Sequence, residues 1–437
     1  AVRERSARWI VTAAYSDAPS GVTKVELFVK RPGDAVFALG ATQAFAASLS
    51  GTRSFTYTPA LGDGTYAFST VATDAAGNVQ ATPGAAQAST VYDATAPTAA
   101  AGAATHTATS PFAITATFSD ATSGVASVAL WVKRPGDAGY AQTASYAAAG
   151  VPSGSMVFTY AAALGEGTYA FYALATDDAG NAQATPDTAQ ASVVYDVSPP
   201  TASASSPAYA GGPFTVSVPY GDAASGATSI GLYVQRPGDA AFGLAATQTF
   251  AASLAGTSSF TYTPALGEGA YGFYTVATDA VGHVQATPAQ QSLTFYDATA
   301  PSTAITALPA YEPATFTLSV AYSDAASGVT SVTLYDNGVS YATQTFAAST
   351  GGTRTFGYTG AGGAHAFTAR ATDAAGNIQA VPATQASTTI DTTAPSAGVT
   401  GLPAYETTST LALSVGYSDG GSGVTSVTLY ADGAAYS

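Results

Sequence analysis

Aspartate is the residue type in this sequence whose spacing could do chemistry. It recurs about every 100 residues at three places: in a Pro-ended connector, after an aromatic-Ser or aromatic-Gly pair, and opening an Asp-x-Ala-Gly-Asn-like turn. In a sandwich whose strands run alternately up and down, these three segments lie at the end where the chain enters. We therefore expect three groups to converge: Asp93, Asp120, Asp177 and Asp178; Asp196, Asp222 and Asp279; and Asp297, Asp324 and Asp373.

Convergent carboxylates have two interpretations, and both remain open at this point. Like charges at short range repel unless a cation or hydrogen bonds offset them. Ca²⁺ takes about six to eight oxygen ligands, so three Asp with carbonyls and water would make a rigidifying site at each junction. Alternatively, each Asp caps its own turn through its side chain. The sequence has no EF-hand loop, and His283 stands where the other copies have Asn.

One aromatic residue per repeat recurs on the outer face of the predicted second strand. The row is Phe28, Trp131, Tyr233, Tyr335 and Tyr430. Such a row could stack on sugars, contact another protein chain, or pack on Tyr172 and Tyr274 of the adjacent strand. All three interpretations remain open.

Catalysis has little support in the sequence. There is no cysteine, and the three histidines His106, His283 and His365 fall at unrelated repeat positions. No Gly-x-Ser-x-Gly motif occurs in a strand-turn-helix context. Glu166 and Glu268 occupy a turn that we expect to be solvated. We therefore expect no enzymatic activity and no cofactor besides the Ca²⁺ considered above.

The element that positions these residues is a strand that recurs four times and is most regular over residues 165–181. Tyr169, Phe171, Ala173 and Ala175 alternate along it and so share one face. A Leu-Gly-Glu-Gly turn precedes the strand, and the Asp-x-Ala-Gly-Asn turn follows it. The rest of the chain repeats in phase with this block.

The remaining segments also alternate with a period of two, and none has helical periodicity with caps. In the first repeat, the other predicted strands cover residues 9–15, 24–30, 41–46, 54–57 and 88–92. Arg31-Pro-Gly-Asp34 is predicted to be a tight turn, and Asp336-Asn-Gly338 a two-residue hairpin. The predicted fold class is all-β: tandem immunoglobulin-like antiparallel sandwiches of Greek-key type in a linear array.

The composition of the chain restricts the classes of molecule that we expect as partners. The chain has 437 residues, of which 47% are apolar and 9% charged, and its net charge is −15. This acidic balance argues against nucleic acid and against anionic membranes as partners. No apolar run of about 20 residues predicts a membrane span.

Pro-containing connectors that begin at Asp93, Asp196, Asp297 and Asp391 divide the sequence into repeats. The expected units are residues 1–95, 96–198, 199–299 and 300–393, with a partial repeat over 394–437. The first unit lacks an evident opening strand. Either this is a segment of a longer array, or a strand from a neighbouring chain completes an unfinished sandwich.

The pattern Leu-Gly-Glu-Gly-Thr-Tyr-Ala-Phe…Ala-Thr-Asp-x-Ala-Gly-Asn, with Asp-x-Thr-Ala-Pro connectors, resembles bacterial immunoglobulin-like and fibronectin type III-like surface repeats. The resemblance implies seven-stranded Greek-key sandwiches. It also implies that Tyr66, Tyr169 and Tyr271 are tyrosine corners, a position at which His365 departs from the pattern. Such repeats serve as stalks, spacers or adhesive modules of surface proteins, and as accessory modules of secreted enzymes.

We therefore expect an extracellular structural protein at the cell surface: a stalk, an adhesin segment or a filament subunit. Its expected partners are other copies of itself, neighbouring surface proteins or glycans. The alternative is a set of carbohydrate-binding accessory modules of a larger secreted enzyme.

Overall fold

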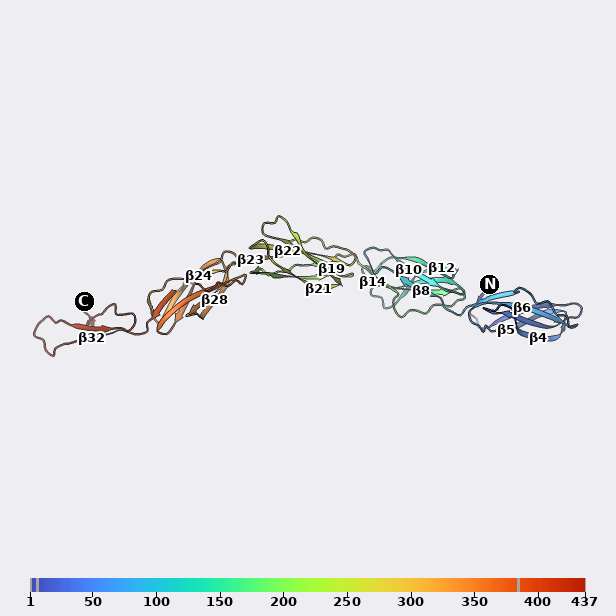
Figure 1. Ribbon diagram of the computed structural model, residues 1–437, viewed down its shortest axis with the longest axis horizontal. Helices are drawn as coiled ribbons and strands as arrows, with labels where there is room; N and C mark the ends of the chain where they lie inside the picture. Colours follow the sequence, from blue (N-terminus) through green and yellow to red (C-terminus); the bar gives the residue numbers. More distant parts are fainter. Residues whose placement is uncertain (1, 5–7, 383–385, 437) are drawn as a thin grey trace.

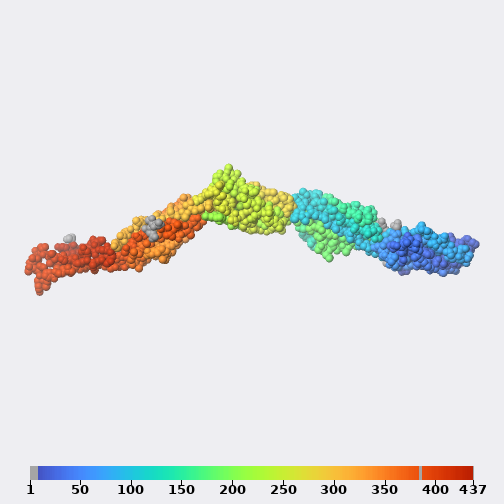
Figure 2. All heavy atoms as spheres, in the orientation of Figure 1, coloured from blue at the N-terminus to red at the C-terminus, as the bar shows by residue number. Residues whose placement is uncertain are grey.

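Four β-sandwiches follow one another in a row, and two small two-stranded sheets lie at the C-terminal end (Figure 1). The computed structural model describes residues 2–4, 8–382 and 386–436, and these contain strands and turns but no helix. The space-filling view shows a thin, gently bent rod in which sequence order runs from end to end (Figure 2). The predicted fold class, tandem antiparallel sandwiches in a linear array, is confirmed.

The second sandwich shows the complete pattern. Its five-stranded sheet has the order β12-β11-β14-β15-β9, and its three-stranded sheet the order β13-β10-β8. The strands are β8 (Thr98–Gly102), β9 (His106–Thr107), β10 (Phe112–Ser119), β11 (Val125–Lys133), β12 (Ala141–Val151), β13 (Ser153–Tyr160), β14 (Gly167–Asp177) and β15 (Ala191–Tyr195). Only β9 pairs in parallel, with β15. A two-residue strand has no alternation, so the sequence did not predict it.

The third and fourth sandwiches repeat this topology. The third comprises β16 (Thr201–Ala202), β17 (Tyr209–Ala210), β18 (Phe214–Gly221), β19 (Ala227–Gln235), β20 (Gly243–Ser253), β21 (Ala255–Tyr262), β22 (Gly269–Asp279) and β23 (Ser292–Tyr296). The fourth comprises β24 (Ser302–Ile305), β25 (Tyr311–Glu312), β26 (Thr315–Ser323), β27 (Val329–Asp336), β28 (Val339–Ser349), β29 (Gly351–Thr359), β30 (Gly363–Asp373) and β31 (Ala386–Ile390).

The two ends of the chain differ from this pattern. The first sandwich comprises β1 (Val2–Glu4), β2 (Trp9–Ser16), β3 (Val22–Lys30), β4 (Ala38–Ser48), β5 (Ser50–Tyr57), β6 (Gly64–Asp74) and β7 (Ala88–Tyr92). Its smaller sheet contains only β2 and β5. At the other end lie β32 (Ser396–Thr400), β33 (Ser414–Ser418), β34 (Tyr430–Ala431) and β35 (Ala434–Ala435), which form the pairs β32-β33 and β34-β35.

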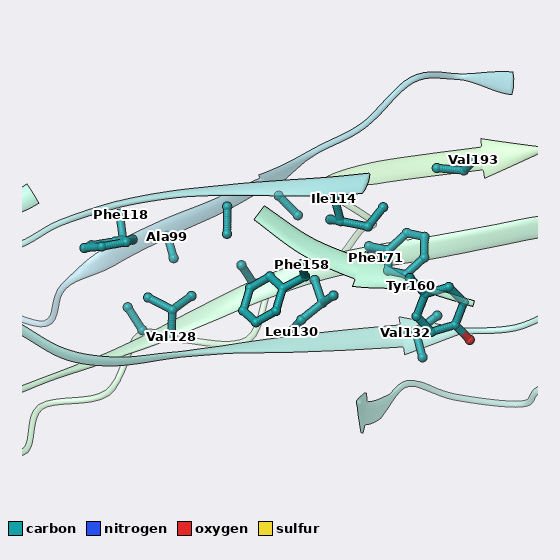
Figure 3. Close-up of a cluster of buried hydrophobic side chains, with 14 of the residues drawn as sticks. Ala99, Ile114, Phe118, Val128, Leu130, Val132, Phe158, Tyr160, Phe171 and Val193 are labelled. Carbon is teal, nitrogen blue, oxygen red and sulfur yellow. The ribbon is translucent and has the colours of Figure 1, made fainter. Parts of the chain in front are cut away.

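Each of the four sandwiches has its own buried core, drawn from its own strands. In the second, Tyr169, Phe171 and Ala173 are fully buried, as the alternation along β14 predicts. Figure 3 shows Phe171 among Ile114, Phe158 and other side chains from both sheets. Fully burying one large apolar side chain stabilises the folded state by roughly 1.5–3 kcal/mol. Because each core contains several such side chains from its own strands, each sandwich is stabilised by its own core.

A tyrosine near the start of the recurring strand (β6, β14 and β22) ties that strand to the turn before it. The hydroxyls of Tyr66, Tyr169 and Tyr271 donate to the carbonyls of Gly62, Gly165 and Gly267 at 3.0, 2.8 and 2.8 Å. In the fourth sandwich, Nε2 of His365 lies 3.0 Å from the carbonyl oxygen of Ala361. The imidazole of His365 therefore replaces the tyrosine hydroxyl in the contact with the carbonyl four residues earlier.

Candidate functional site

Three aspartates from three segments meet where the third sandwich joins the fourth. Asp297 lies in the connector after β23, Asp324 follows β26, and Asp373 is the last residue of β30. One carboxylate oxygen from each lies within 4.8 Å of the others. The three residues are only 0, 5 and 3% exposed, so water screens their charges poorly. We call this group the third-junction cluster.

Hydrogen bonds hold two members of the third-junction cluster in place. Asp297 accepts from the backbone nitrogens of Thr299 and Ser327, both at 2.9 Å, which ties the connector to the loop after β26. Asp373 accepts from the backbone and side-chain nitrogens of Asn377, both at 2.8 Å. The side-chain nitrogen of Asn377 also donates to the carbonyl of Asp297 at 2.8 Å. Both residues thus accept hydrogen bonds within their own turns, which are the bonds that turn capping requires.

Asp324 is different because one of its oxygens is left over. Its Oδ2 accepts from the backbone nitrogens of Ala326 and Gly328. Gly328 has a φ of 82°, which explains the Ser-Gly pair after this loop. Oδ1 of Asp324 is buried and has no hydrogen-bond partner among the described residues. A buried acceptor in this state costs about 1–3 kcal/mol, more when it is charged.

The electrostatics of the cluster show an excess of negative charge. Burial is the largest influence on the pKa of Asp373 and raises it, and the charges of Asp297 and Asp324 raise it further. The hydrogen bonds from Asn377 act in the opposite direction but do not cancel these effects, so the net pKa is raised. Turn capping thus leaves the negative charge only partly offset.

The first junction has a matching group of Asp93, Asp120 and Asp177, all buried. Asp93 accepts from the backbone nitrogen of Ser123 at 2.9 Å, as Asp297 does from Ser327. Asp178 was expected to join this group, but it is exposed and lies outside it. Adjacent residues at a strand end point to opposite sides, which explains why only one of the pair turns inward.

The second junction has a different composition, since its group is Asp196, Asp279 and His283. Nδ1 of His283 lies 3.0 Å from Oδ2 of Asp279. Asp222 lies outside the group, and its Oδ1 is buried without a partner among the described residues. Burial alone would raise the pKa of Asp196, but hydrogen bonds from Ser225 and Ser198, together with the charge of His283, outweigh it, so the net pKa is lowered.

The sequence analysis missed a second set of carboxylates, which hold the first three connectors from the preceding sandwich. Asp63 accepts from the backbone nitrogen of Ala94 and the hydroxyl of Thr95. Glu166 and Glu268 accept from the backbone nitrogens of Val197 and Ala298 at 2.7 and 3.0 Å. The sequence feature that could have revealed them is the acidic residue of the Leu-Gly-Glu-Gly turn. It precedes the connector residue that it binds by 31, 31 and 30 positions. We call these residues the connector latches.

The aromatic row lies on the five-stranded sheets and is only partly exposed in the four sandwiches. Trp131 stacks on Tyr172 with ring centroids 5.9 Å apart, and Tyr233 stacks on Tyr274 at 4.7 Å. Phe28 and Tyr335 pair across strands with Ser69 and Thr368, which have no ring. Packing on the adjacent strand therefore accounts for Trp131 and Tyr233. Tyr430, on β34, is exposed.

Two segments of the chain, residues 5–94 and 85–197, match the sequence model of a family described as bacterial Ig-like domain. None of the curated proteins compared with the chain matches it. The matched segments lie in the first two sandwiches, and the third and fourth sandwiches repeat the sheet topology of the second, so the chain is a tandem array of immunoglobulin-like sandwiches.

Among solved structures, the tetra-tandem repeat from the extending region of a large adhesion protein has 17% identity. It covers 87% of this chain and 95% of its own, with a TM-score of 0.29. Fibronectin(III)-like modules of Clostridium thermocellum CbhA have 15% identity, cover 44% and 95%, and give a TM-score of 0.29. The FN1-FN3 domains of chicken CNTN1 have 10% identity, cover 64% and 95%, and give the same TM-score of 0.29.

Within the part of the chain that the structure describes, there is no helix long and apolar enough to cross a membrane.

Proposed function

We propose that the chain is an extracellular structural protein that holds surface modules apart, as a stalk, an adhesin segment or a subunit of a filament. The observation that carries this is the row of separately cored sandwiches (Figures 1 and 2). We place the boundaries between the units in the connectors, which gives units of residues 1–95, 96–198, 199–299, 300–393 and 394–437. The proposed work is mechanical rather than catalytic.

The connectors support this proposal because each of the first three is held from both sides. At the third junction, Glu268 of the preceding sandwich accepts from Ala298, and Asp297 accepts from Ser327 of the following sandwich. Pro301 fixes one backbone dihedral a few residues later. A short connector held in this way has few independent torsions left. The array should therefore transmit tension or bending without free hinges.

We further propose that the third-junction cluster binds Ca²⁺ and that the ion stiffens this joint. Three buried carboxylates lie within reach of one another, and one of them has an oxygen without a donor in the described part of the chain. Together they form a hard-oxygen ligand set. Ca²⁺ accepts such ligands in flexible geometry, and carbonyls and water would complete its shell. The ion would supply the positive charge that the turn hydrogen bonds do not.

Small-angle X-ray scattering of the purified chain, with excess chelator and with 1 mM CaCl₂, tests the proposed function. An extended rod in both conditions, longer or stiffer with Ca²⁺, supports both proposals. If the chain is an extended rod and its scattering profile does not change with Ca²⁺, the structural role is supported and the proposed stiffening by Ca²⁺ is contradicted. A compact or freely jointed chain in both conditions overturns the structural role itself.

A further inference from the structure

The fourth sandwich has a pair of ionisable side chains at positions where the other three sandwiches have valine and tyrosine. Asp336 pairs across strands with the phenylalanine of the recurring strand, as do three buried valines of the other sandwiches: Val29, Val132 and Val234. His365 occupies the position of the tyrosine that bonds the preceding turn. Both replacements occur in one sandwich, and their side chains meet there, with Nδ1 of His365 3.0 Å from Oδ2 of Asp336.

The carboxylate of Asp336 lies between two donors in a poorly solvated place. The hydroxyl of Tyr358 donates to its Oδ2 at 2.8 Å, and Nδ1 of His365 lies on its other side. The side chains of His365 and Asp336 are only 13 and 20% exposed. Burial, followed by the hydrogen bond to Asp336 and its charge, raises the pKa of Tyr358 to about 12. The phenol therefore keeps its proton and remains a donor, and the carboxylate relies on His365 for the second one.

Both ring nitrogens of His365 face acceptors. Nδ1 faces the carboxylate of Asp336, and Nε2 lies 3.0 Å from the carbonyl oxygen of Ala361. A neutral imidazole donates from only one nitrogen, whereas the imidazolium donates from both. The hydroxyl oxygen of Tyr358 lies 3.1 Å from Nδ1, but if it donated there, the carboxylate would lose both of its donors. All of these contacts are therefore satisfied together only when the ring is protonated.

The other elements around His365 bring side chains that do not titrate. Its cross-strand partner on β31 is Thr388, and the hollow beside the ring is otherwise lined by alanine, serine, threonine and asparagine. Tyr341 of β28 contacts Tyr358, with ring centroids 4.7 Å apart. Within the described part of the chain, the titratable groups that face His365 are thus Asp336 of β27 and Tyr358 of β29.

We propose that Asp336, Tyr358 and His365 form a pH-sensitive switch that stabilises one end of the fourth sandwich when His365 holds a proton. At this end the start of β30 pairs with the end of β31, which runs into the connector that begins at Asp391. A histidine in an unfolded chain has a pKa of about 6.5. The stability that the switch contributes is therefore fully present below about pH 6.5 and is lost at higher pH, as the folded sandwich releases the proton.

Hydrogen exchange of β30 and β31 in the full chain tests the switch, from pH 6 to 8.5 in chelator and corrected for the pH dependence of intrinsic exchange. Protection should fall by at least about threefold over this range, and by no more than about tenfold per pH unit because one proton is released. The double variant Asp336→Val/His365→Tyr has the side chains of the other sandwiches and should show a flat profile. His283→Asn, which removes the other histidine that contacts an aspartate, is the matched control and should keep the parent slope.

A conservative variant covers the case in which the double variant does not fold. Asp336→Asn keeps an acceptor for Tyr358 but removes the negative charge, so the profile of β30 and β31 should become flat in this variant too. Flat protection of both strands in the parent chain overturns the switch, as does a parent slope that persists in Asp336→Asn. A slope that also disappears in His283→Asn overturns it as well, because the pH dependence would then arise outside the fourth sandwich.

Discussion

The second and third junctions are built from the same connector and loop positions, but different side chains contact their buried aspartates. At the third, the side-chain nitrogen of Asn377 donates to Asp373. Oδ1 of Asp324, like Oδ1 of Asp222 at the second, has no hydrogen-bond partner among the described residues. At the second, an imidazole takes the place of the amide, with Nδ1 of His283 3.0 Å from Asp279. The net pKa of Asp373 is raised, whereas that of Asp196 is lowered. The residue that follows the Asp-x-x-Gly turn, Asn377 at the third junction and His283 at the second, is thus the main difference between two groups that are otherwise built alike.

The largest expected effect comes from Asp324→Asn, whose sign should depend on Ca²⁺. In chelator, the variant should stabilise the fourth sandwich by about 1 kcal/mol, because it removes a charged buried acceptor without a partner. At a Ca²⁺ concentration of about 100 times Kd, it should lose about 2.7 kcal/mol of ligand stabilisation. Hydrogen exchange of β26 and β30 measures both effects.

Asp222→Asn is the matched control, because Asp222 caps the equivalent turn but lies outside the second group. It should stabilise the third sandwich in chelator and show no loss with Ca²⁺. A Ca²⁺-dependent loss in this control, or its absence in Asp324→Asn, would contradict the proposed ion site.

Exchanging the two side chains should move the ion between junctions. Asn377→His replaces the amide that bridges Asp373 and the carbonyl of Asp297 by a bulkier imidazole, and it should weaken Ca²⁺ binding there about tenfold, or about 1.4 kcal/mol. His283→Asn should strengthen Ca²⁺ binding at the second junction. Calcium titrations followed by nuclear magnetic resonance of the two loops would report each site separately. Unchanged affinities at both junctions would show that the imidazole does not govern the difference.

The two junctions should respond oppositely to acid. The lowered pKa of Asp196 contributes stability that is present above the unfolded value of about 3.8 and is lost as pH falls through the lower folded value. The raised pKa of Asp373 contributes stability that is present below about 3.8 and is lost as pH rises through the higher folded value.

Hydrogen exchange from pH 3 to 6 in chelator, for the parent chain and for Asp196→Asn and Asp373→Asn, measures these slopes. Each variant should lose the pH dependence of its own sandwich. Slopes of the same sign at both junctions would refute the assignment of charge balance.

The smallest expected effect belongs to the connector latches. Glu268→Ala removes the acceptor for Ala298 and should cost about 0.5–1.5 kcal/mol, mostly as freer motion of the third joint. Gly362 occupies the latch position of the fourth sandwich, so that junction already lacks the carboxylate. Spin-label distances across the third junction should broaden in Glu268→Ala toward the spread at the fourth. An unchanged distribution would mean that the latch does not restrict the joint.

Much of the fold could be predicted from the sequence because alternation is local. The inward set on β14 and the positive φ values of Asn337 and Gly338 in the predicted hairpin follow directly from neighbouring residues. The Asp groups could be anticipated from loop topology alone. Asp178 could not be placed, because a turn sends the adjacent carboxylates of Asp177 and Asp178 to different sides. The position of Asp222 outside the second group has no local sequence signal. The latches were missed because Glu268 meets Ala298 only once two ends of one sandwich are brought together.

Isothermal titration calorimetry with CaCl₂ on the chelator-treated chain tests the central claim most directly, with Asp324→Asn measured alongside. We expect a saturable site in the parent chain that disappears in Asp324→Asn and persists in Asp222→Asn. A parent chain that binds no Ca²⁺, or an Asp324→Asn variant that binds it equally well, would rule out an ion at the third-junction cluster.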